Sequence, residues 1–201
     1  MAESLTHITD AELLDRYCEG DQVAFRELVE RYKSGLYAFL HRFLNNHQLI
    51  EDVFQETFLQ LFMSRDSFDR NRSLRPWLFT IAANKAKDAL RKAQRTNAVS
   101  VGSFVNSDDM SFDEVFNLLA CDTDVPVEAL QQEETAKRVR QIISSMPVNL
   151  REILIMAYFN QFSYKQMAEI LSIPIGTVKS RLHTAVGRFS KEWMSGSFDK
   201  E

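Results

Sequence analysis

The chain has 201 residues, of which 45% are hydrophobic and 26% charged, so it can fill the core of one mid-sized domain or two small ones. Its formal net charge of −4 argues against a protein that coats nucleic acid with its whole surface. The sequence has two distant cysteines, Cys18 and Cys121, and four histidines without metal-ligand spacing, so we expect a reduced protein without metal or cofactor. It has no leader-like or membrane-spanning run, so we expect a cytoplasmic protein.

The N-terminal part has helical periodicity from residue 10 onward. Thr9 and Glu12 form a capping-box pattern for a first helix, which Gly20 ends. A second helix follows from about residue 21, and a third covers about 48 to 63. Both repeat apolar residues at three- and four-residue steps, as the core of a helical bundle requires. In the third helix the expected core residues are Val53, Phe54, Phe58, Leu61 and Phe62.

A fourth helix, with Pro76 in its first turn, has two different faces. Leu78, Phe79, Ala82, Ala86 and Ala89 make its buried arc. On the opposite side one tryptophan, one amide and charged residues line up, namely Trp77, Asn84, Asp88, Arg91 and Arg95, and Lys85, Lys87 and Lys92 flank them. An exposed tryptophan can stack on unpaired bases while cations hold phosphates, but a solvated basic face with a half-buried tryptophan explains the same pattern equally well.

Residues 96–132 break this pattern. Between Arg95 and Lys137 the sequence has no Lys or Arg, whereas nine Asp or Glu residues fall in the interval. This segment is expected to be an acidic flexible linker, and a solvated tether is its simplest interpretation. A short helix over 112–120 would fit within it.

After the linker, helices are expected to about residue 145, over 149–159 and, from a capping box of Ser163 and Gln166, over "YKQMAEIL". The turn at Ser172 to Pro174 precedes a last helix with an apolar stripe and a polar stripe. The apolar stripe is Val178, Leu182, Ala185 and Phe189, and the polar stripe is Thr177, Ser180, Arg181, Thr184 and Arg188. Two helices joined by a short turn, the second polar outside, are typical of a helix-turn-helix, although a plain helical hairpin has the same spacing.

Two blocks of the sequence resemble the extracytoplasmic-function group of bacterial RNA polymerase sigma factors. "FSYKQMAEILSIPIGTVKSRLHTAVGRF" resembles the fourth region of that group. "EDVFQETFLQLF" and "RPWLFTIAANKAKDALRKAQR" resemble its second region, in the expected order. The resemblance covers about residues 10 to 95 and 133 to 192.

The resemblance implies roles for the N-terminal part. The third helix would dock on core RNA polymerase through Asp52, Gln55 and Glu56, with Phe58 and Phe62 as core residues. Residues 67–75 would capture a flipped base of the minus-10 element, which Asn84 helps to hold. Trp77 would lie beside the separating strands, and Lys85, Lys87, Arg91 and Arg95 would hold the backbone of the melted strand.

In the C-terminal part, the resemblance implies contacts to the minus-35 element. They map onto Thr177, Lys179, Ser180, Arg181, His183 and Thr184, and Arg188 on the same face is added from the spacing. Many relatives have arginines where this chain has Thr184 and Val186. Each lost arginine removes a bidentate contact to guanine, about 1–3 kcal/mol of discrimination, so we expect an unusual or weak minus-35 preference.

The sequence thus predicts an all-α protein with two small helical domains, a bundle over 1–95 and a helix-turn-helix domain over 133–201, joined by the acidic linker. Its expected function is promoter specificity, with core RNA polymerase and promoter DNA as partners and no catalysis; the family also admits an anti-sigma partner. A free-standing helix-turn-helix regulator remains the alternative. The third helix distinguishes the two hypotheses, because a regulator of that kind needs no helix for docking on polymerase.

Overall fold

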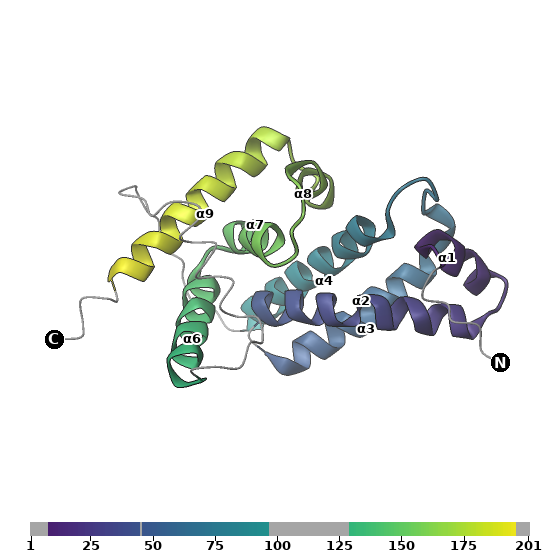
Figure 1. The fold of residues 1–201 in the computed structure, drawn as a ribbon, viewed down its shortest axis with the longest axis horizontal. Coiled ribbons are helices and arrows are strands. Elements are labelled where there is room, and N and C mark those ends of the chain that lie inside the picture. The colour runs from purple at the N-terminus through teal and green to yellow at the C-terminus, as the bar shows by residue number, and fades with distance from the viewer. Residues whose placement is uncertain (1–7, 45, 97–128, 196–201) are drawn as a thin grey trace.

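The computed structural model describes residues 8–44, 46–96 and 129–195, and every regular element within these ranges is a helix (Figure 1). The N-terminal part contains α1 (Asp10–Cys18), α2 (Gln22–Phe43), α3 (His47–Met63), a 3-10 turn (Arg65–Ser67) and α4 (Leu74–Thr96). The C-terminal part contains α6 (Ala129–Ser145), α7 (Val148–Tyr158), α8 (Tyr164–Leu171) and α9 (Ile175–Ser195). Most of the expected linker, including the helix expected over 112–120, lies outside the described residues, and α6 begins inside the expected linker range.

Local capping explains where several helices begin and end. The Thr9 hydroxyl accepts from the Glu12 amide at 3.3 Å, but the Glu12 carboxylate pairs with Arg16 at 3.2 Å instead of completing a capping box. The expected box at Ser163 and Gln166 is complete in both directions. Gly20 has a φ of +102°, which only glycine adopts readily, so α1 stops where the sequence predicts.

The N-terminal core is built on α2, which packs against α1, α3 and α4. Phe39 and Phe43 are fully buried, and the Phe39 ring meets that of Phe79 on α4 at 5.5 Å between centroids. Phe58 is buried as expected. Phe62 was expected in this core, but its exposed fraction is 37%. It lies near the end of α3, where the Tyr17 ring covers one side and the Arg65 guanidinium lies over its face.

The C-terminal part packs α9 against α7, α8 and α6. The predicted apolar stripe of α9 is confirmed, because Val178, Leu182, Ala185 and Phe189 are all buried. A fifth residue, Val186, is 3% exposed and belongs to the same stripe. It therefore supports the core and does not lie on the polar face.

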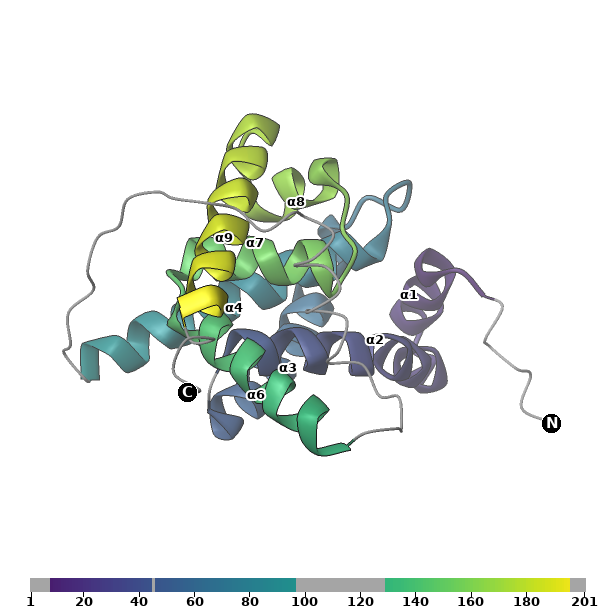
Figure 2. The ribbon, with the colours of Figure 1, turned by 60° about the vertical axis from the view of Figure 1, so that its left-hand side comes forward.

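The two parts lie against each other, as Figures 1 and 2 show from two directions. Helix α4 packs on α8, and α2 packs on α6 and α7. The Phe79 ring meets Phe162 at 5.0 Å, and Arg75 donates to the carbonyl oxygen of Asn160 at 2.7 Å. The predicted pair of helical domains is present, and the structure adds that they are docked.

Arg151, on α7, links this interface to the α6–α7 corner. It is 8% exposed and donates to the carbonyl oxygens of Phe43, Ser144 and Met146. Burial lowers the pKa of Arg151, which reflects the cost of holding its charge away from water. The hydrogen bonds offset that cost, and they join the end of α2 to the C-terminal part.

We expect Arg151→Ala to lower the free energy of unfolding by about 3 kcal/mol, because three carbonyl groups lose their donor and two of these hydrogen bonds are buried. Urea unfolding followed by circular dichroism at 222 nm measures this change. Arg26→Ala, which removes an exposed arginine from α2, should change the free energy by less than about 0.5 kcal/mol. Equal effects of the two substitutions would contradict a stabilising role for Arg151.

Candidate nucleic-acid and polymerase interfaces

The α8–α9 pair has the geometry of a helix-turn-helix. Helix α8 ends at Leu171, and the next residue, Ser172, has a φ of +53°, which puts the chain in the left-handed region and turns it toward Pro174. Helix α9 then presents Lys179, Ser180, His183 and Thr184 as exposed side chains, with Thr177 half-buried at its first turn. The Ser180 and Thr184 hydroxyls donate to helix carbonyls one turn back, so these short side chains leave a smooth surface for close approach.

The arginines of α9 differ from the predicted pattern. Arg181 and Arg188 are both half-buried, and the Nε atom of Arg188 is buried. Arg188 is therefore at the margin of the polar face. The burial of Val186 corrects the expectation attached to it, because an arginine at this position would point into the core. Of the two positions, Thr184 and Val186, only Thr184 is exposed, so only there does the absence of an arginine remove a contact to guanine.

The candidate minus-10 residues of α4 differ in exposure. Asn84 and Arg91 are exposed, and Arg91 pairs with Asp88 at 3.1 Å. Trp77 is half-buried and stacks on Phe68 with centroids 4.9 Å apart, which matches the more conservative of the two interpretations. Arg95 lies in α4, but its side chain is outside the described ones.

The segment before α4 is held by its own contacts. Arg70 donates to the carbonyl oxygens of Arg65 and Phe68 and pairs with Asp15 of α1 at 2.9 Å. Phe68 is buried beneath Trp77. A segment organised in this way can hold one conformation before any nucleic acid arrives.

Lys85 and Lys87 both have carboxylate partners. The Lys85 ammonium lies 3.4 Å from Glu56 on α3, within the N-terminal part. The Lys87 ammonium lies 3.4 Å from Glu152 on α7, and the exposed fractions of these side chains are 21% and 5%. Lys87 therefore faces the C-terminal part and is largely closed to solvent in this arrangement.

Glu152, on α7, was not predicted from the sequence. Burial raises the pKa of Glu152, while the positive charges of Lys87 and Arg181 oppose that rise. One buried carboxyl thus interacts with a candidate minus-10 residue and a candidate minus-35 residue. Helical periodicity gave no signal for it, because Glu152 lies within an α7 segment in which residues 150–156 are all buried.

The candidate polymerase contacts form a continuous exposed stripe on α3. Asp52, Gln55 and Glu56 are exposed, and the Gln48 amide donates to Asp52 at 3.0 Å. The stripe continues with two apolar residues, Leu59 and Met63, which are 59% and 67% exposed. Leu59 and Met63 follow Gln55 by four and eight residues, and this helical spacing could have predicted from the sequence that they lie on the same face of α3. We call this surface, which consists of Asp52, Gln55, Glu56, Leu59 and Met63, the α3 stripe.

Comparisons with known proteins match both parts of the chain. Residues 28–96 match the family model of sigma-70 region 2, and residues 136–188 match that of sigma-70 region 4. The ECF RNA polymerase sigma factor SigW of Bacillus subtilis is 32% identical over 82% of this chain and 86% of its own length. The RNA polymerase sigma-H factor of Pseudomonas aeruginosa is 32% identical over 90% of this chain and 92% of its own.

Two solved structures share the fold. CnrH in complex with the cytosolic domain of CnrY has a TM-score of 0.63 at 22% identity, covering 92% of this chain and 97% of that one. The sigma factor RpoE of Bartonella quintana, in complex with the anti-sigma factor NepR, has a TM-score of 0.62 at 23% identity, covering 88% and 98%. Within the described residues, no helix is long and apolar enough to cross a membrane.

Proposed function

The chain belongs to the ECF group of sigma-70-family RNA polymerase sigma factors, and we infer that it is the promoter-specificity subunit of a bacterial RNA polymerase. The observation that carries this function is the presence of both sigma regions, in order, in one chain. A free-standing regulator is disfavoured, since it needs only the helix-turn-helix. Members of the family are promoter-recognition subunits, and we propose that this chain acts in the cytoplasm with no catalysis of its own.

We propose that α9 reads the minus-35 element through Thr177, Lys179, Ser180, Arg181, His183 and Thr184, with Arg188 at the margin. Exposed hydroxyls and cations on one face, over a fully buried opposite stripe, support this assignment. For the minus-10 element and strand separation we propose Trp77, Asn84, Lys85, Lys87, Arg91 and Arg95. Binding energy to the single strand would drive the opening of the duplex.

The docked arrangement cannot contact both elements at once. The two elements are about 25 base pairs apart by their designations, which is about 85 Å of B-form DNA at roughly 3.4 Å per pair. In the structure, however, Arg75 of α4 bonds directly to Asn160 beyond α7. The 32 residues of 97–128 could extend to about 110 Å at most, so the chain is long enough for the domains to separate. We propose that separation precedes promoter binding.

A partner that controls this separation fits the same geometry. One similar solved structure has an anti-sigma factor bound to a sigma factor. We propose that an anti-sigma protein binds this chain and favours the docked arrangement. To do so, such a partner needs only to bind the docked form more tightly than the separated form.

The α3 stripe provides the test of polymerase binding. We expect Asp52→Lys with Gln55→Ala to weaken binding to core RNA polymerase from the source organism at least about tenfold, because the double variant replaces two exposed polar contacts of the stripe. Surface plasmon resonance with immobilised core enzyme measures the affinity. Glu56 is left unchanged, because its replacement would also disturb Lys85.

A matched control makes the same chemical changes on the C-terminal part. Glu192→Lys with Gln141→Ala alters two exposed side chains outside the α3 stripe and should bind core enzyme within about twofold of wild type. If wild-type protein does not bind the core enzyme, the assigned function is wrong. If both variants bind equally, the α3 stripe is not the docking surface.

A further inference from the structure

One arginine organises the segment between α3 and α4, residues 65–73. The Nη1 atom of Arg70 donates to the carbonyl oxygens of Arg65 and Phe68 at 2.7 and 2.8 Å, so it closes the segment on itself. Its Nε atom donates to the Asp15 carboxylate at 2.9 Å, which ties the segment to α1. Because a guanidinium group is a planar fork, these bonds fix its orientation as well as its position. We call the pair of Asp15 and Arg70 the α1 clamp.

The α1 clamp reaches Trp77 through Phe68. Phe68 is 6% exposed, and its ring stacks on that of Trp77 with centroids 4.9 Å apart. The bond from Arg70 holds the carbonyl group of Phe68, and the Arg70 guanidinium lies 5.8 Å from the centre of the same ring. Trp77 is half-buried, so part of the indole stays exposed to solvent. The orientation of that exposed part therefore depends on where the clamp holds Phe68.

The α1 clamp lies wholly within the N-terminal part, where the segment runs beside α1 (Figure 1). Asp15 precedes residues 28–96, so α1 contributes to this segment from outside the range that matches sigma-70 region 2. Arg72 of the same segment pairs instead with Glu169 of α8, in the C-terminal part. When the domains separate, the pair with Glu169 is lost and the α1 clamp stays.

We propose that Asp15 and Arg70 are positioning residues for the single strand of the minus-10 element. They hold Phe68, and through it Trp77, in the orientation that receives an unpaired base, and they act without touching the base themselves. An aromatic side chain that is held in place before binding loses less conformational freedom than a mobile one when a base stacks on it. This inference rests on the proposed role of Trp77 in strand separation.

The first measurement needs no DNA. Trp193→Phe leaves Trp77 as the only tryptophan of the full-length chain, and quenching of its fluorescence by acrylamide reports how accessible the indole is. Arg70→Lys keeps the charge but loses the planar fork, so it should raise the quenching constant at least about twofold. Asp15→Asn, at an exposed position, should change it in the same direction, and circular dichroism at 222 nm checks that both variants stay folded. Unchanged quenching in both variants would overturn the proposal.

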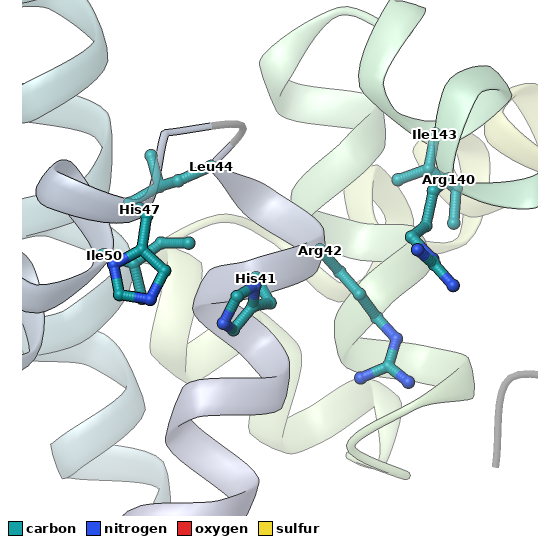
Figure 3. Close-up of a pocket in the computed structure, with 7 residues that line it drawn as sticks. All are labelled: His41, Arg42, Leu44, His47, Ile50, Arg140 and Ile143. Carbon is teal, nitrogen blue, oxygen red and sulfur yellow. The ribbon is translucent and has the colours of Figure 1, made fainter. Parts of the chain in front are cut away.

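Two matched controls separate the clamp from general loosening. Arg42 also donates to a carbonyl oxygen, that of Ala38, and lies over a ring, that of Phe159. It lines the cavity of about 290 Å³ at the end of α2 away from α1 (Figure 3), so Arg42→Lys should leave the quenching constant unchanged. Glu12→Gln breaks the exposed pair with Arg16 on α1 and should also leave it unchanged. Equal increases in the controls and the clamp variants would contradict the inference.

The second measurement separates base stacking from phosphate binding. The probes are a fluorescein-labelled single strand of twelve deoxyadenosines and an abasic strand of the same length. Their anisotropy with reconstituted holoenzyme is compared with that in core enzyme alone. Because bases of any kind stack on aromatic side chains, holoenzyme with wild-type protein should prefer the strand with bases at least about fivefold. Arg70→Lys should lower this preference below about twofold and leave the abasic strand within about twofold.

Asp15→Asn gives a test of sign. It removes a negative charge, so electrostatics alone would tighten the binding of both strands, whereas loss of the clamp weakens binding of the strand with bases. Tighter binding of that strand would overturn the proposal.

The remaining outcomes distinguish this inference from the proposed function. If holoenzyme with wild-type protein shows no preference for bases beyond that of core enzyme, Trp77 receives no base, and the proposed minus-10 role fails together with the clamp. If the preference is present and Arg70→Lys keeps it, the minus-10 role stands and the positioning role of Arg70 is wrong.

Discussion

Replacing both Lys179 and Arg181 by Ala is expected to lower promoter-directed transcription at least about 100-fold while leaving core polymerase binding within about twofold. An arginine that contacts a base edge contributes about 1–3 kcal/mol of discrimination, and a lysine on a phosphate contributes a salt-dependent share of affinity. Lys179 is exposed and Arg181 is half-buried, and neither belongs to the buried stripe of α9, so the fold should persist. Reconstituted transcription from a cognate promoter measures the effect.

The single variants separate the roles of the two residues. Lys179→Ala should weaken binding similarly at all sequences and reduce the slope of log affinity against log salt by about one. Arg181→Ala should relax the choice of base at one minus-35 position. Lys191→Ala, at an exposed position two turns or more along α9, serves as the control. Full transcription by the double variant would refute the assignment of α9 as the reading helix.

The helices themselves were predictable because their signals are local. A cap, a glycine with positive φ and an apolar stripe all act within one or two turns, and Gly20, Ser163 and the α9 stripe are where the sequence places them. Val186 was predictable too, because it follows the buried Leu182 by four residues. The expectation of a lost arginine contact at Val186 came from the resemblance to sigma factors and not from the helical spacing.

The docking of the domains was not predictable in this way. The bond from Arg151 to Phe43 joins residues 108 apart, and that from Arg75 to Asn160 joins residues 85 apart. No periodicity reports such pairs. Phe62 was misjudged, and the exposure of Trp77 was left open, for a related reason, since their exposure depends on whether Tyr17 and Phe68, from other segments, cover them.

Reversing the charge of Glu152 is expected to separate the domains. In Glu152→Lys, a nearly buried cation faces Lys87 and lies near Arg181. The native carboxylate instead carries the charge opposite to both residues. An uncompensated buried charge costs about 3–5 kcal/mol, which shifts the balance toward the separated form by at least about 100-fold. Small-angle X-ray scattering should show a radius of gyration well above the roughly 17 Å of a compact chain of this length.

Two variants test whether the charge itself is responsible. Adding Lys87→Glu to Glu152→Lys restores an opposite pair and should restore compaction in part. Glu192→Lys makes the same charge change at an exposed position of α9 and should leave the radius unchanged. A compact Glu152→Lys protein, or an expanded Glu192→Lys protein, would show that this pair does not control docking.

The pH dependence of folding stability follows from the direction in which burial moves the pKa of Glu152. Because this pKa is raised above its ordinary value of 4.5, the folded chain binds the proton of Glu152 more tightly than the unfolded chain does. This contribution to stability is therefore fully present below pH 4.5 and is lost as the pH rises through the raised pKa. Glu152→Gln, which stays neutral, should remove this part of the pH dependence, and urea unfolding at pH 4.5 and at neutral pH measures it. The same pH dependence in wild type and in Glu152→Gln would contradict the assignment to Glu152.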